Sequence, residues 1–508
     1  MTERSTLHRL VSGGALRTIS LLISIVVAFL MMPFVVQHLG DRWYGLWIIV
    51  GSLIGFYGYL DFGLSSASQR FIAKAIHSKE EDVSTVASTA MFLFSGLSFI
   101  TILVTIAITL SAPYFVENPT EQVTFQLVIL ILGLKSAIMF PFLVFTGFIN
   151  AHLRYDIDTY VSVTKLLLRT GLIVAYLTMG YSIIALAVIT LITETFGYIA
   201  IAIWAKKIHP TLSISLKKRD KKLIPHFFNY SKFTFIASLG DILRFKIDNL
   251  VIASYIGLAM VTHYAIAIRL IEYVGQLLTA VLGIFLPVFT KYDAQGKDEE
   301  MREKFLIITE ISVFLTLLLV PPLMIVGKIF IGLWMGEQYS GSYFPLLILA
   351  IASILAGCNR VCITALYAKA KHSYYAKINL IEGGINLLLS LILVQQYGIL
   401  GVALGTTIST IYVKAVLLPR YTCEVLELSF FRYNKILLKH LSFAFLYYGA
   451  FFWGFKQIDI DDYFGLLLFC CVMCSIYAAC CLLIFSKSLQ QELLKLIPMR
   501  ILGFIRKD

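Results

Sequence analysis

Thirteen charged side chains lie inside long apolar runs of the sequence, where a charge is costly and therefore informative. The cations are Lys135, Lys165, Arg169, Arg244, Lys246, Arg269 and Arg360, and the acids are Asp61, Glu194, Asp241, Asp248, Glu272 and Glu382. A charge at the centre of a membrane helix costs about 2.5–3.5 kcal/mol to insert. Such residues usually face the interior of a helix bundle and often mark the path of a substrate. The small excess of cations favours binding of an anionic group, such as a pyrophosphate or an acidic sugar.

Arg360 and Lys135 lie near the middle of their apolar runs, and neither has an acid within one helical turn. Each would either pair with an acid on another helix, such as Glu194 or Glu382, or line a cavity that binds an anion. The planar fork of donors on arginine suits the second role. Lys165 and Arg169 would share a helix face, and Arg17 would lie at the cytoplasmic edge of the first run. The full set of candidate binding cations is Arg360, Lys135, Arg244, Arg269, Lys165, Arg169 and Arg17.

Two groups of embedded charges also have a purely structural explanation. Asp241, Arg244 and Asp248 follow one another at i, i+3 and i+7, so a salt bridge within one helix fits the pattern equally well. Arg269 and Glu272 have the same i, i+3 relation. The sequence leaves open whether these residues bind a substrate or neutralise each other.

Asp61 lies at the end of the second apolar run, in YLDFGLSSASQR. We expect it to cap a helix or to pair with Arg70, with a part in a gate as the alternative. The acids that are candidates for coupling to H⁺ or Na⁺, or for gating, are Asp61, Glu194, Asp241, Asp248 and Glu382. Candidates for stacking against sugar rings are Tyr57, Tyr59, Tyr255, Tyr264 and Tyr367, although aromatic residues are common at membrane interfaces without such a role.

The composition requires that lipid surrounds most of the chain. Of the 508 residues, 59% are hydrophobic and only 14% are charged, and the mean hydropathy is +0.84. Soluble domains are about half apolar and a quarter charged. The net charge is +12, but the basic residues fall between apolar runs, which is typical of membrane topology rather than of nucleic-acid binding.

The sequence gives no indication of a cofactor, a metal centre or an enzyme. Cys470, Cys471 and Cys474 have metal-like spacing, but no histidine is near and the surroundings are apolar, so we expect buried free thiols. We expect no disulfides. The sequence contains neither a Walker A motif nor a nucleophile–base pair, which disfavours direct use of ATP and an enzymatic role.

Apolar runs of about 20 residues predict membrane-spanning helices, because only helices and closed barrels satisfy the backbone in lipid. Fourteen are expected, near 13–38, 43–66, 84–110, 122–149, 159–179, 182–205, 230–257, 262–290, 304–328, 343–368, 375–395, 398–419, 438–456 and 463–486. With the N-terminus in the cytoplasm, the inner segments hold 32 Lys and Arg residues and the outer segments hold 3. This asymmetry predicts that both termini are cytoplasmic. The first run is too long for a signal peptide.

The two halves of the chain resemble each other at an offset near 216 residues. YSIIALAVITLIT (181–193) matches YGILGVALGTTIS (397–409) without a gap, and Leu39–Gly40 parallels Ile256–Gly257. Repeats of six helices are typical of transporters. We expect a six-helix lobe over 1–205, a basic cytoplasmic linker over 206–229, a second six-helix lobe over 230–420, and an additional helix pair with a cytoplasmic tail over 421–508. The pseudo-twofold axis would run along the membrane normal.

Two passages resemble the polysaccharide transporter family, the O-antigen and exopolysaccharide flippases of bacteria. They are LGDRWYGLWIIVGSLIGFYGYLDFGLSSASQRFIAK (39–74) and DNLVIASYIGLAMVTHYAIAIRL (248–270). The resemblance implies the fold of the multidrug/oligosaccharidyl-lipid/polysaccharide (MOP) superfamily. It also implies transfer of an undecaprenyl-pyrophosphate-linked sugar from the cytoplasmic to the periplasmic leaflet. The last two helices resemble the extra pair of the peptidoglycan-lipid flippase.

We therefore expect a flippase of the bacterial inner membrane that works by alternating access on a polyprenyl-pyrophosphate-linked oligosaccharide. Its partners would be that lipid, membrane lipids and other polysaccharide-assembly proteins, and not nucleic acid. A multidrug or cation antiporter of the same superfamily is the first alternative, and it should prefer a more acidic cavity. A membrane oligosaccharide polymerase and a non-transporting scaffold are the others.

Overall fold

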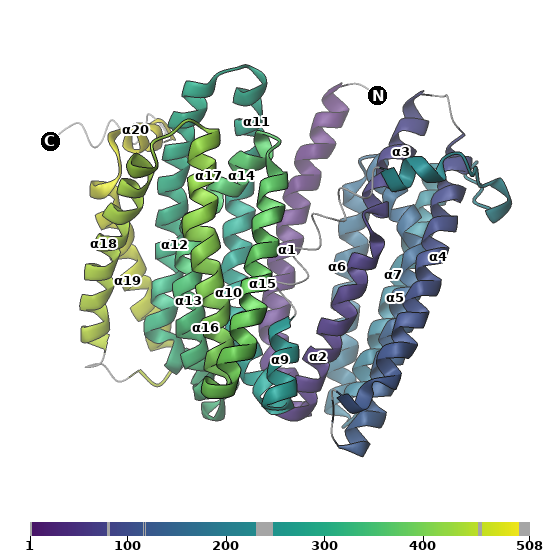
Figure 1. Ribbon diagram of the computed structural model, residues 1–508, viewed down its shortest axis with the longest axis horizontal. Coiled ribbons are helices and arrows are strands. Elements are labelled where there is room, and N and C mark those ends of the chain that lie inside the picture. The colour runs from purple at the N-terminus through teal and green to yellow at the C-terminus, as the bar shows by residue number, and fades with distance from the viewer. Residues whose placement is uncertain are drawn as a thin grey trace. The chain divides into compact units, whose positions relative to one another are not determined.

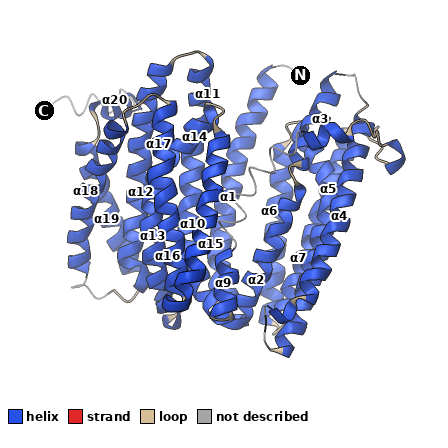
Figure 2. Cartoon of the chain, viewed as in Figure 1, coloured by secondary structure: helices blue, strands red, loops and turns tan. Residues whose placement is uncertain are grey.

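A computed structural model describes residues 3–78, 82–114, 116, 118–229, 247–455 and 460–496. Within these residues every regular element is a helix, as Figure 2 shows. The chain forms two compact units, residues 1–262 and 263–508. The all-helical membrane fold predicted from the sequence is confirmed.

The first unit contains α1 to α7 and α9, labelled in Figure 1. Their bounds are α1 Glu3–Leu39, α2 Asp41–Tyr57, α3 Leu64–Ser78, α4 Val83–Leu110, α5 Pro119–Ala151, α6 Tyr155–Thr178, α7 Ile183–Ile208 and α9 Ile247–Tyr255. Local signals set the helix starts. The Asp82 side chain accepts from two backbone N–H groups at the start of α4. The Asn118 side chain accepts from the Thr120 N–H at the start of α5, which has a proline at its first position.

The segment 206–229 packs against α4. Backbone N–H groups of Ser213, Ser215 and Asp220 donate to hydroxyls of Ser84, Ser88 and Thr89 at 3.0–3.3 Å. Every third or fourth residue of a helix lies on one face. The hydroxyls of α4 therefore form a strip that satisfies backbone donors of a segment with little regular structure of its own.

The second unit contains α10 to α20, and α10 begins at the boundary between the units. The bounds are α10 Leu258–Gly283, α11 Leu286–Ala294, α12 Asp298–Met335, α13 Tyr343–Cys358, α14 Arg360–Ala368, α15 His372–Tyr397, α16 Ile399–Thr410, α17 Leu418–Val425, α18 Phe430–Phe455, α19 Tyr463–Ile484 and α20 Lys487–Leu496. A π-helical segment, η5 (Ile411–Leu417), joins α16 to α17 without a break.

The helix pair α18–α19 is attached to α12 through carbonyls that two prolines leave free. Proline has no N–H, so Pro321–Pro322 cannot donate to the carbonyls four residues earlier in α12. Instead, the Tyr448 hydroxyl of α18 donates to the Leu317 carbonyl at 2.7 Å. The Cys474 thiol of α19 donates to the Leu318 carbonyl at 3.7 Å. The pair shares one hydrophobic core with the rest of the second unit.

The described residues hold 13 helical spans that are long and apolar enough to cross a membrane. Each agrees with one predicted span. The fourteenth, predicted over 230–257, lies mostly outside the described residues, which include only its end as α9. The predicted helix ends were less accurate, because the span that begins at Asp298 and the one that ends at Val425 run several residues past the apolar runs.

The sequence repeat recurs as a repeated backbone turn. Leu153 and Ala370 lie 217 residues apart, and both adopt a left-handed conformation with φ of 56° and 55°. In both turns the next N–H bonds to the carbonyl five residues back, from Arg154 to Ile149 and from Lys371 to Leu366. Gly40 and Gly257, also 217 residues apart, both have positive φ. Equivalent turns at one spacing agree with the repeat read from the sequence.

Candidate functional site

Three helices of the first unit bring together cations that the sequence singled out. The Lys165 Nζ of α6 lies 2.7 Å from Glu194 Oε2 of α7, and Arg169 Nη1 lies 3.3 Å from Glu194 Oε1. Lys165 and Arg169 are four residues apart, so both point from the same face of α6. Lys135 of α5 interacts electrostatically with all three. We call Lys135, Lys165, Arg169 and Glu194 the cation cluster.

Neighbouring residues fix the geometry of the cation cluster. Tyr198 lies one turn after Glu194 in α7, and Lys165 Nζ lies 5.9 Å from the Tyr198 ring centre. A Cβ at Gly197 would lie 3.0 Å from Lys165 Cδ, so the absence of a side chain leaves room for the lysine stem. In Figure 1 these residues belong to the blue helices α5, α6 and α7, which pack against one another.

The cation cluster carries more positive than negative charge. It has three cations and one carboxylate, a surplus of two positive charges. The side chains of Lys165 and Arg169 are 22% and 32% exposed, whereas Glu194 is 13% exposed. The acid is therefore the most covered of the three, whereas both cations are partly exposed and have donors beyond the one that contacts Glu194. Charge-assisted hydrogen bonds from such donors are the strong ones, and this arrangement can bind an oxyanion.

Arg17, another predicted cation of the first unit, has an aromatic partner. Arg17 of α1 is exposed and lies over the Tyr155 ring at 4.1 Å, at the start of α6. Nearby, Arg154 forms an ion pair of 2.9 Å with Asp156, and this hydrogen bond raises the pKa of the Arg154 guanidinium. A cation stacked on an aromatic face keeps most of its donors available.

Asp61 acts as a cap. Its carboxylate accepts from the Ser65 backbone N–H at 3.1 Å and from the Ser65 hydroxyl at 3.0 Å, at the first turn of α3. This agrees with the capping role expected from the sequence. A part in gating stays a prediction.

The second unit contains a buried ion pair in which only the acid is among the residues named from the sequence. Lys414 lies within the predicted span 398–419, in the π-helical segment η5, and is 3% exposed. Its Nζ lies 3.1 Å from Glu382 Oε2 of α15, and it donates to Asn379 Oδ1 at 2.5 Å. The Thr410 hydroxyl donates to the other Glu382 oxygen at 2.9 Å. Glu382 thus has a buried cation as its partner.

The remaining predicted residues are dispersed. Arg360 of α14 donates to the Thr279 hydroxyl of α10, and Arg269 of α10 pairs with Glu272 at 2.8 Å. The second contact is the i, i+3 pair that the sequence allowed. Asp248 is buried in α9. Asp241, Arg244 and Lys246 lie outside the described residues.

Comparison with known proteins gives the family. The family described as "Polysaccharide biosynthesis protein" matches residues 39–344. A Haloferax volcanii protein named as a probable low-salt glycan biosynthesis flippase is 25% identical over 51% of this chain and 56% of its own length. The chain thus spans just over half of that relative. A Shigella flexneri protein named as an O-antigen transporter is 23% identical over 79% of this chain and 96% of its own length. These names denote transport rather than catalysis, as predicted.

Solved structures confirm the fold class. The lipid II flippase MurJ in an inward closed conformation has a TM-score of 0.69 at 15% identity, covering 91% of this chain and 97% of its own. An inward-facing multidrug resistance transporter of the MATE family and MOP superfamily has a TM-score of 0.67 at 17% identity, covering 79% and 95%. The chain therefore has the same fold as these two solved structures. Because the family match covers more than half of the chain, the chain belongs to the family of polysaccharide biosynthesis proteins.

Proposed function

We propose that the chain is a flippase that moves a polyprenyl-pyrophosphate-linked oligosaccharide, an O-antigen or exopolysaccharide repeat unit, from the cytoplasmic to the outer leaflet. The membrane is the bacterial inner membrane, and both termini are cytoplasmic, as the 32-to-3 distribution of Lys and Arg supports. The lobes are 1–205 and 230–420, joined by the linker 206–229, with residues 421–508 as an added helix pair and tail.

One observation carries the proposal: the surplus positive charge of the cation cluster. A pyrophosphate has several anionic oxygens, and each can accept from a lysine or arginine donor. Lys165 and Arg169 are partly exposed and have donors beyond those that contact Glu194, which holds both side chains in place. The fixed geometry means that little ordering is needed when the headgroup binds. The polyprenyl tail stays in lipid while the lobes change access.

The other predicted cations extend this path. Arg17 would meet the headgroup at the cytoplasmic edge, and Arg244, Arg269 and Arg360 would contact it from the second lobe. Arg360→Ala should weaken transport under this proposal. The acids named from the sequence (Asp61, Glu194, Asp241, Asp248 and Glu382) stay candidates for coupling to H⁺ or Na⁺ or for gating. Other polysaccharide-assembly proteins are proposed partners on the outer side.

A multidrug antiporter is the alternative that the fold itself favours, since multidrug transporters share it. The cation cluster argues against it, because a surplus of two positive charges repels a cationic drug. The two functions therefore predict opposite effects of neutralising the cluster. A flippase should lose activity, whereas export of a cationic dye such as ethidium should be unchanged or improved.

The test uses cells that lack the gene and are complemented with full-length variants. Lipid-linked glycan should accumulate in the inner leaflet of the deletion strain and disappear on complementation with the wild-type chain. Lys165→Ala/Arg169→Ala removes the surplus charge but leaves Lys135 opposite Glu194, so the acid keeps a counter-ion. A charge-assisted hydrogen bond contributes about 1.5–3 kcal/mol, so each lost bond should weaken headgroup binding roughly 10- to 100-fold.

Lys207→Ala is the matched control, because Lys207 is an exposed cation at the end of α7 that packs on Trp204 outside the cluster. It should complement fully. Absence of accumulation in the deletion strain would refute the flippase function. Full complementation by the double variant would refute the role of the cation cluster.

A further inference from the structure

The first unit contains a second polar cavity, separate from the cation cluster, at the ends of α2, α5 and α9. We propose that this cavity is a binding subsite for a neutral saccharide on the outer side of the membrane. The inference rests on the proposed function, which places the N-terminus in the cytoplasm. The helix ends at residues 41, 119 and 255 then lie on the outer side of the membrane.

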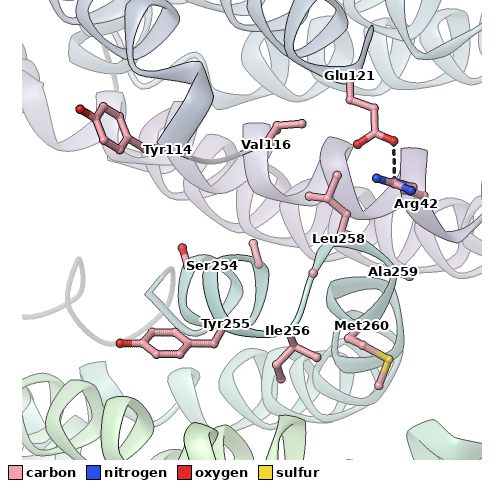
Figure 3. Close-up of a pocket in the computed structure, with 12 residues that line it drawn as sticks. Arg42, Tyr114, Val116, Glu121, Ser254, Tyr255, Ile256, Leu258, Ala259 and Met260 are labelled. Atoms are coloured by element: carbon pink, nitrogen blue, oxygen red, sulfur yellow. Dashed lines mark ion pairs between the residues drawn. The ribbon is translucent and has the colours of Figure 1, made fainter. Parts of the chain in front are cut away.

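The cavity has the size of a small-ligand site. Its volume is about 420 Å³, and its lining includes Arg42, Tyr114, Glu121, Ser254, Tyr255 and Met260. Ligand pockets usually have volumes of about 300–1,000 Å³. Figure 3 shows Tyr114 and Tyr255 at one end of the cavity and the Arg42–Glu121 pair at the other.

The charged pair offers hydrogen-bond donors to the cavity. Arg42 Nε lies 2.5 Å from Glu121 Oε1, with the arginine side chain 59% exposed and the glutamate 8% exposed. The covered glutamate is the counter-ion that orients the arginine. The exposed guanidinium donors of Arg42 would bind the oxygens of a ligand in the cavity.

The electrostatics favour a neutral ligand over a phosphate. The Arg42–Glu121 pair has no net charge, unlike the cation cluster. The carboxyl end of α9, residues 253–255, also borders the cavity. Carbonyls at a helix C-terminus lack helical donors and carry partial negative charge. These groups repel an anion and accept hydrogen bonds from hydroxyls, which a saccharide has in large number.

Two tyrosines supply apolar surface beside these polar groups. Tyr114 and Tyr255 line the cavity, and both rings are largely exposed. An aromatic ring presents an apolar face together with a polar hydroxyl. A pyranose has the matching character, because its C–H face is apolar while its rim carries hydroxyls. Polar groups at one end and ring faces at the other therefore suit a sugar better than they suit an ion or a lipid tail.

The walls of the cavity are held in place by close packing. A Cβ at Gly45 would come within 1.9 Å of the Leu258 carbonyl oxygen, so the turn after α9 touches the backbone of α2. The Thr262 hydroxyl donates to the Asp41 carbonyl at 2.6 Å, and Asn249 donates to the Ser52 hydroxyl at 3.0 Å. These contacts within the protein fix the walls of the cavity.

The test uses full-length protein in lipid nanodiscs. The probe is the oligosaccharide released by mild acid from the surface polysaccharide of the producing cells, and binding is measured by saturation-transfer NMR and titration calorimetry. We expect wild-type protein to bind it and Tyr255→Ala to bind it at least 10-fold more weakly. The control is Tyr181→Ala. Tyr181 is 55% exposed, close to the 52% of Tyr255, and it does not line the cavity. This variant should bind the oligosaccharide with wild-type affinity.

Because removing Arg42 alone would leave Glu121 buried without its counter-ion, the pair is tested as Arg42→Gln/Glu121→Gln. This variant should also lose at least 10-fold in affinity. Inorganic pyrophosphate should not compete with the oligosaccharide. Competition by pyrophosphate, absence of binding to the wild-type chain, or wild-type affinity in both cavity variants would each overturn the subsite.

The subsite and the proposed function fail in different ways. Accumulation of lipid-linked glycan in the deletion strain, with wild-type binding in the cavity variants, would leave the flippase standing and remove the subsite. Binding that depends on Tyr255, without any accumulation in the deletion strain, would leave a saccharide site on a protein with another function.

Discussion

Replacing Tyr448 by phenylalanine should detach the helix pair α18–α19 from α12. The hydroxyl of Tyr448 is buried and donates to the Leu317 carbonyl at 2.7 Å. That carbonyl has no helical donor, because the residue four positions later is Pro321. Phenylalanine keeps the ring and its packing but leaves the carbonyl buried without a partner.

The expected cost is about 1–3 kcal/mol, which is the usual penalty for a buried polar group that loses its partner. Expressed as an equilibrium, this raises the population of the detached state roughly 5- to 150-fold. The neighbouring Tyr447 gives the matched control. Its hydroxyl donates to the Met473 carbonyl at 2.6 Å, and Met473 lies in a helix without proline, so that carbonyl keeps its helical donor. Tyr447→Phe should cost less than 1 kcal/mol.

The assay is thiol labelling of the folded protein with all its cysteines retained, and tandem mass spectrometry locates the label at Cys481. Cys481 is fully buried in α19, so its labelling rate reports transient opening. Tyr448→Phe should raise the rate 5- to 150-fold, and Tyr447→Phe should not. Pro321→Ala restores an N–H that can donate to Leu317, so the effect of Tyr448→Phe should largely vanish in that background. An equal effect in both backgrounds would refute the explanation, because the freed carbonyl would then not be the cause.

Two further substitutions test buried contacts. Lys414→Ala leaves Glu382 as an uncompensated buried charge and should destabilise the chain by about 3–5 kcal/mol. The double variant Lys414→Met/Glu382→Leu should recover most of that loss. Unfolding in detergent measures the stability of both variants. If the single variant were as stable as wild type, the pair would not be buried. Gly45→Ala should lower the free energy of unfolding by about 1–3 kcal/mol, because the added Cβ meets the backbone of the turn after α9. Gly51 lies in the same helix with open space around it, so Gly51→Ala should be neutral or stabilising. Equal stability of the two glycine variants would contradict the close packing.

Hydrophobic runs predict the helices well because lipid leaves no other way to satisfy the backbone. The same rule does not say which charges are buried. Lys414 falls near the end of the predicted span 398–419, but its burial follows from the π-helical segment η5 and from Glu382 on another helix. π-Helical turns are stabilised by tertiary packing and are frequent at functional sites. A Lys–Glu pair on two different helices leaves no local pattern in the sequence.

The cation cluster was partly predictable from the sequence, because two of its residues do show a local pattern. Lys165 and Arg169 share a helix face through i, i+4 spacing, which the sequence shows directly. Glu194 lies on the next helix along the chain, and consecutive helices usually pack together. Of the saccharide cavity, the sequence singled out only Tyr255, as a candidate for stacking against sugar rings. Arg42 and Glu121 come from distant helices, and each looks like an ordinary residue at a helix end.

The two sites of the first unit differ in charge, and that difference fits the two parts of one substrate. The cation cluster has a surplus of two positive charges and suits a pyrophosphate, whereas the Arg42–Glu121 cavity is neutral and suits a sugar. If both sites were strongly cationic, the headgroup would be held at each end of its path, and release would be slow. A neutral outer site binds the sugar without trapping the phosphate. The cation cluster would then capture the charge, and the outer site would recognise only the glycan.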